Sequence, residues 1–251
     1  MSSSRMTRCI ALSLGLAATV ASSGCELGLL DGLQKKSTMV HVFATHHATP
    51  EDGTIPHRGG EGEFRVFETD DGWTVTLVKG FVVTTGITLH RCDGTEQSLD
   101  LFRGAVVEDI RTRDLGLSSV GAIEASPGDF CAVTVHYAPL DGSTSAEPEV
   151  DGATVYLYGV AQRGEESVPF EIRANSQIDV ELDLSTIDDG APLHVTGAEH
   201  FPIELTVSKT YDQFFDAIDF TDMPQLDMSE HVLAVLEGVT RVAPGTRVAP
   251  N

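Results

Sequence analysis

Histidines are the residues of this 251-residue chain whose number and spacing are best suited to chemistry, and there are nine of them. Four lie in one short segment, at His41, His46, His47 and His57. Neutral imidazole nitrogens bind copper, zinc or nickel, and a neighbouring carboxylate can complete or orient such a set. Adjacent histidines at a strand end, together with one from a flexible loop, can converge on one ion. The segment predicts a copper or zinc site with His46, His47 and His57 as its first ligands.

Two further histidines lie close to two cysteines in the sequence. His90 precedes Cys92, and His136 follows Cys131. If the cysteines join, both histidines come into the same region, although strand alternation places His136 on the face opposite Cys131. We therefore include His41, His90 and His136 as additional candidate metal ligands.

The competing interpretation is that the histidines are scattered surface or half-buried residues. The chain has no CxxC pair, no HExxH motif and no complete calcium loop, so the spacing matches no strong metal-site signature. Nucleophilic catalysis also finds little support, because Gly116–Gly121 lacks the GxSxG spacing. Trp73, the single tryptophan, is expected to pack in the core rather than to form a sugar-binding platform. The sequence does not predict an enzyme.

The N-terminus resembles the signal peptide of a bacterial lipoprotein. Arg5 and Arg8 precede an apolar stretch over 9–21, and small residues then lead to Cys25. We expect cleavage after residue 24, diacylglycerol on Cys25, and membrane attachment through acyl chains rather than through a helix. An ordinary secretory signal that ends beside a cysteine is the alternative. Residues 25–37 are expected to form a tether.

Two cysteines remain once the signal peptide and the lipidated residue are set aside. Cys9 leaves with residues 1–24, which leaves Cys92 and Cys131. In an oxidising compartment such a pair most simply forms a disulfide. Two buried free thiols and a thiolate metal site are the alternatives.

The charge of the chain excludes some classes of partner. Loss of residues 1–24 removes two arginines and no acid, which takes the formal net charge from −22 to −24. Nucleic-acid binding needs a basic footprint and is therefore not expected. A domain lying on an anionic membrane surface is disfavoured for the same reason. Cation binding is permitted.

Short runs rich in Val, Ile, Thr and aromatic residues dominate the chain after residue 37. Asp-Gly pairs occur seven times, and several separate two such runs, as tight hairpin turns require. The expected strands are 38–46, 63–70, 73–79, 81–92, 97–103, 131–138, 153–162, 168–174, 177–184 and 201–209. This pattern predicts an all-β domain, a β-sandwich of immunoglobulin or transthyretin type with about ten strands.

Two short C-terminal helices complete the expected domain. Apolar residues at helical spacing predict one helix over 210–220 and a second over 229–239, with Ser229 as its N-cap. The single domain is expected to span 38–240. Residues 241–251 are expected to form a flexible tail.

Three segments of the middle of the chain together resemble a known family. They are Gly86-Ile-Thr-Leu-His-Arg-Cys-Asp-Gly-Thr, Ser98-Leu-Asp-Leu-Phe, and Ser126-Pro-Gly-Asp-Phe-Cys-Ala-Val-Thr-Val-His-Tyr. Their order is similar to the core of exported β-sandwich proteins that include the methanobactin-associated periplasmic copper-binding family. The resemblance implies a β-sandwich, copper binding outside the cytoplasm, and in many cases a haem partner protein.

These observations favour a lipid-anchored metal-binding carrier of the cell envelope. Its cofactor would be copper or zinc, and it would lie on the periplasmic face of the outer membrane or on the cell surface. The alternative is a non-catalytic envelope interaction module that binds a protein or glycan partner. Histidines dispersed over the folded domain would favour this alternative.

Overall fold

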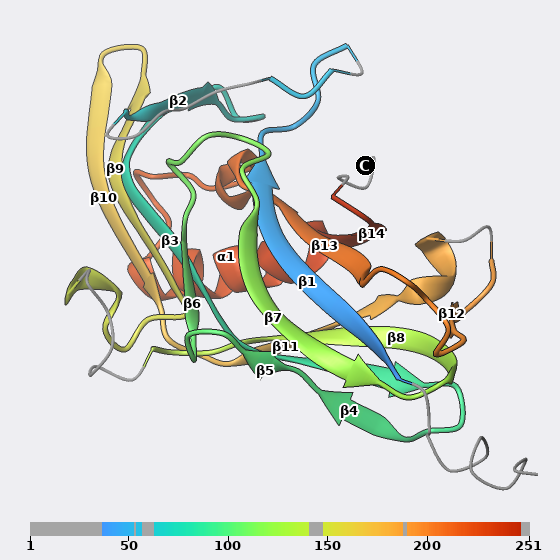
Figure 1. Ribbon diagram of the computed structural model, residues 1–251. Helices are drawn as coiled ribbons and strands as arrows, with labels where there is room; N and C mark the ends of the chain where they lie inside the picture. The colour runs from blue at the N-terminus through green and yellow to red at the C-terminus, as the bar shows by residue number, and fades with distance from the viewer. Residues whose placement is uncertain (1–36, 53, 57–62, 141–147, 188–189, 247–251) are drawn as a thin grey trace, which may run out of the picture. The chain divides into compact units, whose positions relative to one another are not determined.

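The structure is a computed structural model that describes residues 37–52, 54–56, 63–140, 148–187 and 190–246 (Figure 1). The described residues all belong to one compact unit. The predicted signal peptide, Cys25, most of the tether and His57 lie outside them and stay predictions. Among the described residues, no helix is both long and apolar enough to cross a membrane.

The first of two β-sheets has five strands in the order β14-β13-β1-β7-β5. Its central pair, β1 and β13, is parallel, whereas the other neighbours are antiparallel. The strands are β1 (Thr38–His47), β5 (Asp100–Leu101), β7 (Ser118–Ala125), β13 (Ile203–Thr210) and β14 (Thr240–Pro244).

The second sheet is built around one long strand, β3 (Thr74–Arg91). Its main path runs β10-β9-β3-β8-β11, while β2, β4 and β6 pair with β3 and β12 pairs with β8. The other strands are β2 (Arg65–Glu68), β4 (Glu96–Ser98), β6 (Val106–Asp109), β8 (Gly128–Tyr137), β9 (Val155–Arg163), β10 (Glu166–Ala174), β11 (Ile178–Asp183) and β12 (Leu193–Val195).

Strand β3 joins two predicted strands, 73–79 and 81–92, into one. It pairs first with β9 and then with β8, and its register shifts once in the pairing with β9 and twice in the pairing with β8. The approach to β9 is so close that a Cβ on Gly159 would lie 2.2 Å from the Thr76 carbonyl oxygen. Only glycine allows the two backbones to meet there.

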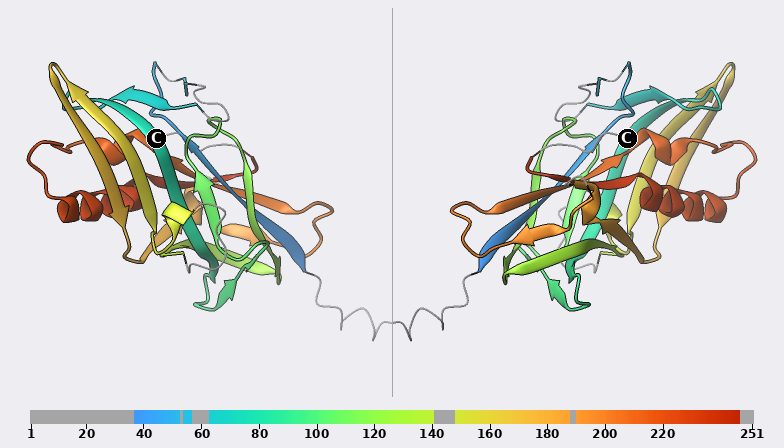
Figure 2. Two further views of the ribbon diagram at one scale, coloured as in Figure 1. Left: turned by 90° about the vertical axis from the view of Figure 1, so that its left-hand side faces the viewer. Right: turned by 90° about the vertical axis from the view of Figure 1, so that its right-hand side faces the viewer.

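The core lies between the sheets and follows the alternation of strand side chains. In β1, Val40, Val42 and Ala44 are buried while Met39 is exposed. Two 3₁₀ turns, η2 (Pro148–Val150) and η3 (Leu184–Ile187), lie in the connections of the second sheet. The one α-helix of the described residues, α1 (Gln225–Val239), packs against β10 and β11 (Figure 2).

The C-terminal helices differ from the sequence prediction. Residues 210–220 form a single 3₁₀ turn, η4 (Asp212–Phe215), because Asp216 is extended and Ala217 has a φ of 60°. The apolar residues behind that prediction are nevertheless in the core, where Phe214 and Phe215 are fully buried. Helix α1 begins at Gln225 after Pro224, so the prediction of an N-cap at residue 229 was wrong.

The all-β, two-sheet class is confirmed, with 14 strands in the described residues instead of about ten. The immunoglobulin or transthyretin type is not shown by this topology. Strands β6, β7, β12 and β14 were not expected from the sequence. Strand β14 includes the first residues of the predicted tail and pairs with β13.

Candidate functional site

His46 belongs to a buried ionic network between the two sheets. It lies at the end of β1, beside Lys209 of the parallel strand β13. The His46 Nδ1 atom lies 2.9 Å from Oε1 of Glu108 on β6, and the Lys209 Nζ atom lies 2.9 Å from Oε2. One carboxylate of the second sheet therefore holds two basic side chains of the first.

An ion pair next to Glu108 extends the network. Arg65 of β2 places Nη2 2.9 Å from Oδ1 of Asp114, and its Nε donates to the Ile110 carbonyl oxygen at 3.1 Å. Arg65 Nη2 also donates to the Thr112 carbonyl oxygen, which lies 3.0 Å from His46 Nε2. The network thus fixes the connection between β6 and β7, residues 110–117.

Electrostatics stabilise the ionised form of this network. Burial by itself raises the pKa of Glu108, yet the Lys209 ammonium and the His46 ring lower it from 4.5 to about 2. Burial alone lowers the pKa of Lys209, but Glu108 raises it above 10.5 overall. Each buried group keeps its charge because an oppositely charged group lies next to it.

The network cannot receive a ligand from solvent. The side chains of His46, Arg65, Asp114 and Lys209 are at most 1% exposed, and that of Glu108 is 4% exposed. Four of the five residues were missed by the sequence reasoning. The available signals were weak, because Lys209 lies between Ser208 and Thr210 in β13, and Glu108 follows Val106 and Val107 in β6.

The other candidate ligands on β1 point elsewhere. His47 follows His46 and therefore faces the opposite side of the strand, where its Nδ1 lies 2.7 Å from the Ala48 carbonyl oxygen. His41 meets the ring of Phe102 edge-on, with ring centroids 6.4 Å apart. These histidines share a segment of sequence but no common centre.

His90 and His136 share the outer face of the second sheet, where two threonines lie between them. His90 Nε2 lies 2.7 Å from Thr134 Oγ1, and His136 Nε2 lies 2.9 Å from Thr88 Oγ1. His136 Nδ1 contacts Asp179 at 2.8 Å, and this hydrogen bond lowers the pKa of Asp179. The arrangement is a row of hydrogen bonds across strands.

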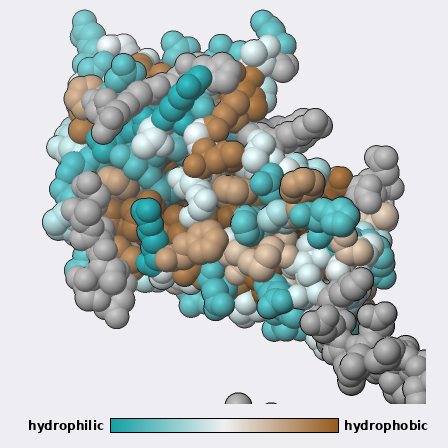
Figure 3. Space-filling model, in the orientation of Figure 1, coloured by the Kyte–Doolittle hydropathy of each residue, from teal (hydrophilic) through white to brown (hydrophobic). Residues whose placement is uncertain are grey.

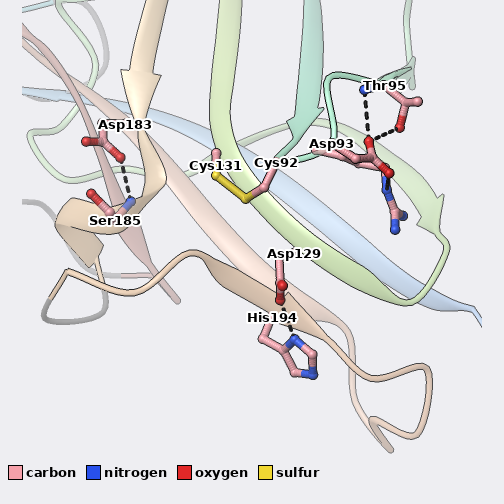
Figure 4. The surroundings of a disulfide bond; sticks show 9 residues. Cys92, Asp93, Thr95, Asp129, Cys131, Asp183, Ser185 and His194 are labelled. Atoms are coloured by element: carbon pink, nitrogen blue, oxygen red, sulfur yellow. Dashed lines mark hydrogen bonds and ion pairs between the residues drawn. A yellow bond between two sulfur atoms is a disulfide. The ribbon is translucent and has the colours of Figure 1, made fainter.

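The predicted disulfide between Cys92 and Cys131 is confirmed (Figure 4). A register shift next to it leaves both Phe130 and Val133 buried, so Cys131 between them is exposed. Cys131 therefore points outward, as His136 does, and the predicted opposition of these two residues was wrong. A disulfide of this kind is typical of an extracytoplasmic compartment.

The described histidines do not meet the requirements of a copper or zinc centre. Such a centre needs about three or four converging nitrogen, sulfur or oxygen ligands. Within the described ranges, no three His, Cys, Asp or Glu side chains are placed to hold a metal ion. Trp73 is fully buried, as predicted, and offers no sugar platform.

A surface hollow between β6 and β7 is the better candidate for a functional site. This β6–β7 cleft encloses about 480 Å³, within the range of ~300–1,000 Å³ found for ligand sites. Phe102 and Arg103 follow β5 at one end, residues 105–107 form one wall, and Ser118 and Ser119 form the other. Figure 3 shows apolar surface gathered over this part of the molecule.

One exposed apolar side chain lines the cleft, and another directly precedes a lining residue in the sequence. Phe102 is 57% exposed, and Leu117, directly before Ser118, is 41% exposed. The wall formed by β6 carries Glu108, and the connection to β7 carries Asp114, so the ionic network holds both walls in place. A prearranged binding surface loses little conformational entropy when a partner binds.

Comparisons with known proteins find a solved structure that is similar to this chain. No protein-family model matches the chain, and no curated protein matches it. A solved structure, MbnP from Methylosinus trichosporium, matches 84% of this chain and 99% of its own, at 10% sequence identity and a TM-score of 0.44. The chain resembles MbnP.

Proposed function

We propose that this chain is an exported, non-catalytic binding module of the cell envelope, anchored by lipid on Cys25, whose partner protein docks at the β6–β7 cleft. The observation that carries the proposal is the cleft itself, with Phe102 exposed in its lining and Leu117 exposed directly before the lining residue Ser118. Apolar side chains gathered around a hollow are typical of a protein-interaction site. The Cys92–Cys131 disulfide and the lipobox-like N-terminus support export.

Metal carriage, which the family resemblance implies, has less support in the geometry. His46 is held by Glu108, His47 faces the other side of β1, and His90 and His136 bond to threonines. The residues that the structure describes do not fit a copper or zinc ion. We expect the full chain, purified without a histidine tag and challenged with both metals, to retain neither ion stoichiometrically. One tightly held ion per chain, measured by mass spectrometry, would restore the carrier function.

Site-specific photocrosslinking in the envelope tests the binding function. A photoreactive phenylalanine replaces Phe102 in the full chain, and the matched control replaces Tyr158. Tyr158 is 41% exposed on β9, which does not border the cleft. We expect a discrete adduct with one protein from position 102 and none from position 158.

The captured protein is then purified and its affinity measured. We expect Phe102→Ala to weaken binding by about tenfold or more, as truncation of a buried aromatic anchor does. Tyr158→Ala should leave the affinity unchanged. No adduct from position 102, or equal losses of affinity in both variants, would overturn the proposed function.

A further inference from the structure

The β6–β7 cleft is bordered by two strand edges that have free backbone groups. Strand β6 pairs only with β3 in the described part of the chain. Strand β7 pairs with β1 on one side, and on the other β5 covers only Gly121 and Ala122. The Phe102 N–H donates one further hydrogen bond to the Val120 carbonyl oxygen, and this is the last backbone bond between the β5 segment and β7 in the described residues.

The backbone of β5 and the residues after it explain why the edge of β7 is left open. A Cβ on Gly121 would lie 2.6 Å from the Asp100 carbonyl oxygen, so β5 approaches β7 most closely there. Gly104 then adopts a φ of 71°, which favours glycine, and the chain turns into β6. Ser118 and Ser119 remain exposed beyond that point.

The cleft runs along the edge of β6 rather than over one face of the sheet. Successive side chains of a strand point to opposite faces. Val106 packs against the core between the sheets, and Val107 packs against a separate apolar cluster that contains Phe81. Both nevertheless line the cleft. A hollow that contacts both residues must follow the strand edge.

One basic side chain in the cleft has no partner. Arg103 forms no ion pair or side-chain hydrogen bond within the described ranges, although the chain carries a formal charge of −22. By contrast, Arg111 pairs with Asp109 and Arg91 contacts Asp93. A guanidinium group at the mouth of a partly apolar hollow suits a carboxylate on the occupant.

We propose that the occupant is an extended segment of a partner polypeptide that adds a β-strand to the edge of β6. Its backbone would bond to the free groups of β6, an acidic side chain would meet Arg103, and an apolar side chain would pack against Phe102. In strand addition of this kind, main-chain hydrogen bonds provide the affinity, and pockets for the side chains of the added strand provide the selectivity. The inference rests on the proposed function, because it identifies what the cleft binds.

A displayed library of short random peptides, panned against the full chain, tests the proposal. We expect the enriched sequences to combine β-branched residues with Asp or Glu. Arg103→Glu should shift the enrichment to Lys and Arg. The matched control, Arg113→Glu, changes an exposed arginine that does not line the cleft and should leave the acidic preference intact. No enrichment, or the same enrichment from both variants, would overturn the proposal.

Backbone pairing is tested with the most enriched peptide. N-methylation of one alternate set of its amides should weaken binding by about tenfold or more, whereas the other set should have little effect, because only alternate amides of a strand face one neighbour. Amide exchange in residues 106–109 should slow on binding. Equal effects of both sets, or unchanged exchange in β6, would refute strand addition.

These outcomes separate the inference from the proposed function. In one case a partner is crosslinked at residue 102, but its affinity is the same for Arg103→Glu and amide exchange in β6 does not change. That result would refute strand addition and leave the proposed binding module standing. A failure of crosslinking at residue 102, with peptides that still bind along β6, would instead refute the proposed envelope partner.

Discussion

Glu108 shows at the scale of one residue how a buried charge joins the two sheets. Its two carboxylate oxygens contact His46 and Lys209, which neighbour each other on parallel strands. A buried ion pair of this kind contributes little net stability compared with apolar side chains of similar size, but the loss of one partner leaves the other charge unpaired. Variants of the pair distinguish these two effects.

We expect Glu108→Gln to lower the free energy of unfolding by about 3–5 kcal/mol, because Lys209 is left buried without a counter-charge. The double variant Glu108→Gln, Lys209→Met should lose much less than the two single variants together. Urea denaturation of the four proteins measures this cycle. Simple additivity would show that the pair is not coupled.

The pKa of Glu108 also predicts a dependence on pH. This pKa is about 2 in the folded chain and is expected near 4.5 in the unfolded chain. The stabilisation is therefore complete above pH 4.5 and lost as the pH falls towards 2. The difference in unfolding free energy between the native chain and Glu108→Gln should shrink across this interval. A difference that stays constant down to pH 2 would contradict the assignment.

The histidines show what the sequence could not reveal at this scale. Their clustering predicted a metal site, whereas His46, one of them, is instead a member of the ionic network. The network depends on a contact between His46 and Glu108, which are 62 positions apart in the sequence. Only the pairing of β1 with β13 and the placement of β6 bring these groups together. Spacing along one segment contains no such information.

At the scale of the element, the closeness of β5 to β7 depends on one residue. We expect Gly121→Ala to lower the free energy of unfolding by about 1–3 kcal/mol, because its Cβ would meet the backbone of β5. Gly238→Ala is the matched control, since no heavy atom lies within 4 Å of its Cβ position in α1. That change should raise the stability by up to about 1 kcal/mol through helix propensity.

Thermal unfolding of the two alanine variants compares them directly. Opposite shifts in melting temperature are the expected result. A neutral Gly121→Ala would mean that β5 moves away at little cost and that its pairing with β7 is weak.

The strands found and missed have a common physical cause. Runs of β-branched and aromatic residues marked β1, β3, β9 and β10. Strand β7 contains Ser, Gly and Ala, which have low strand propensity, and it forms because β1 pairs along its length. The apolar residues of 210–220 are buried although the segment forms only the 3₁₀ turn Asp212–Phe215. Apolar residues at helical spacing therefore indicated burial here, but not an α-helix.

The whole molecule is predicted to be held at a membrane by its lipid. We expect Cys25→Ser to move the protein from the membrane fraction to the soluble fraction, because the acylated thiol is lost. The matched control is Cys9→Ser, which lies in the predicted signal peptide and should leave fractionation unchanged. Intact mass should show the diacylglycerol only when Cys25 is present. Membrane association of Cys25→Ser would contradict the anchor.

The parallel pairing of β1 with β13 has a consequence for the order in which the molecule folds. Val40 pairs with Ile203, so the first strand cannot complete its sheet until almost the whole chain has emerged. A chain that leaves a ribosome or a translocon N-terminus first would hold β1 with an unpaired edge for most of that time. Contacts this distant in sequence slow folding and prolong exposure to aggregation. Vectorial synthesis therefore leaves one edge of this early strand unpaired until β13 emerges, and a chaperone that covers the edge would act during this interval.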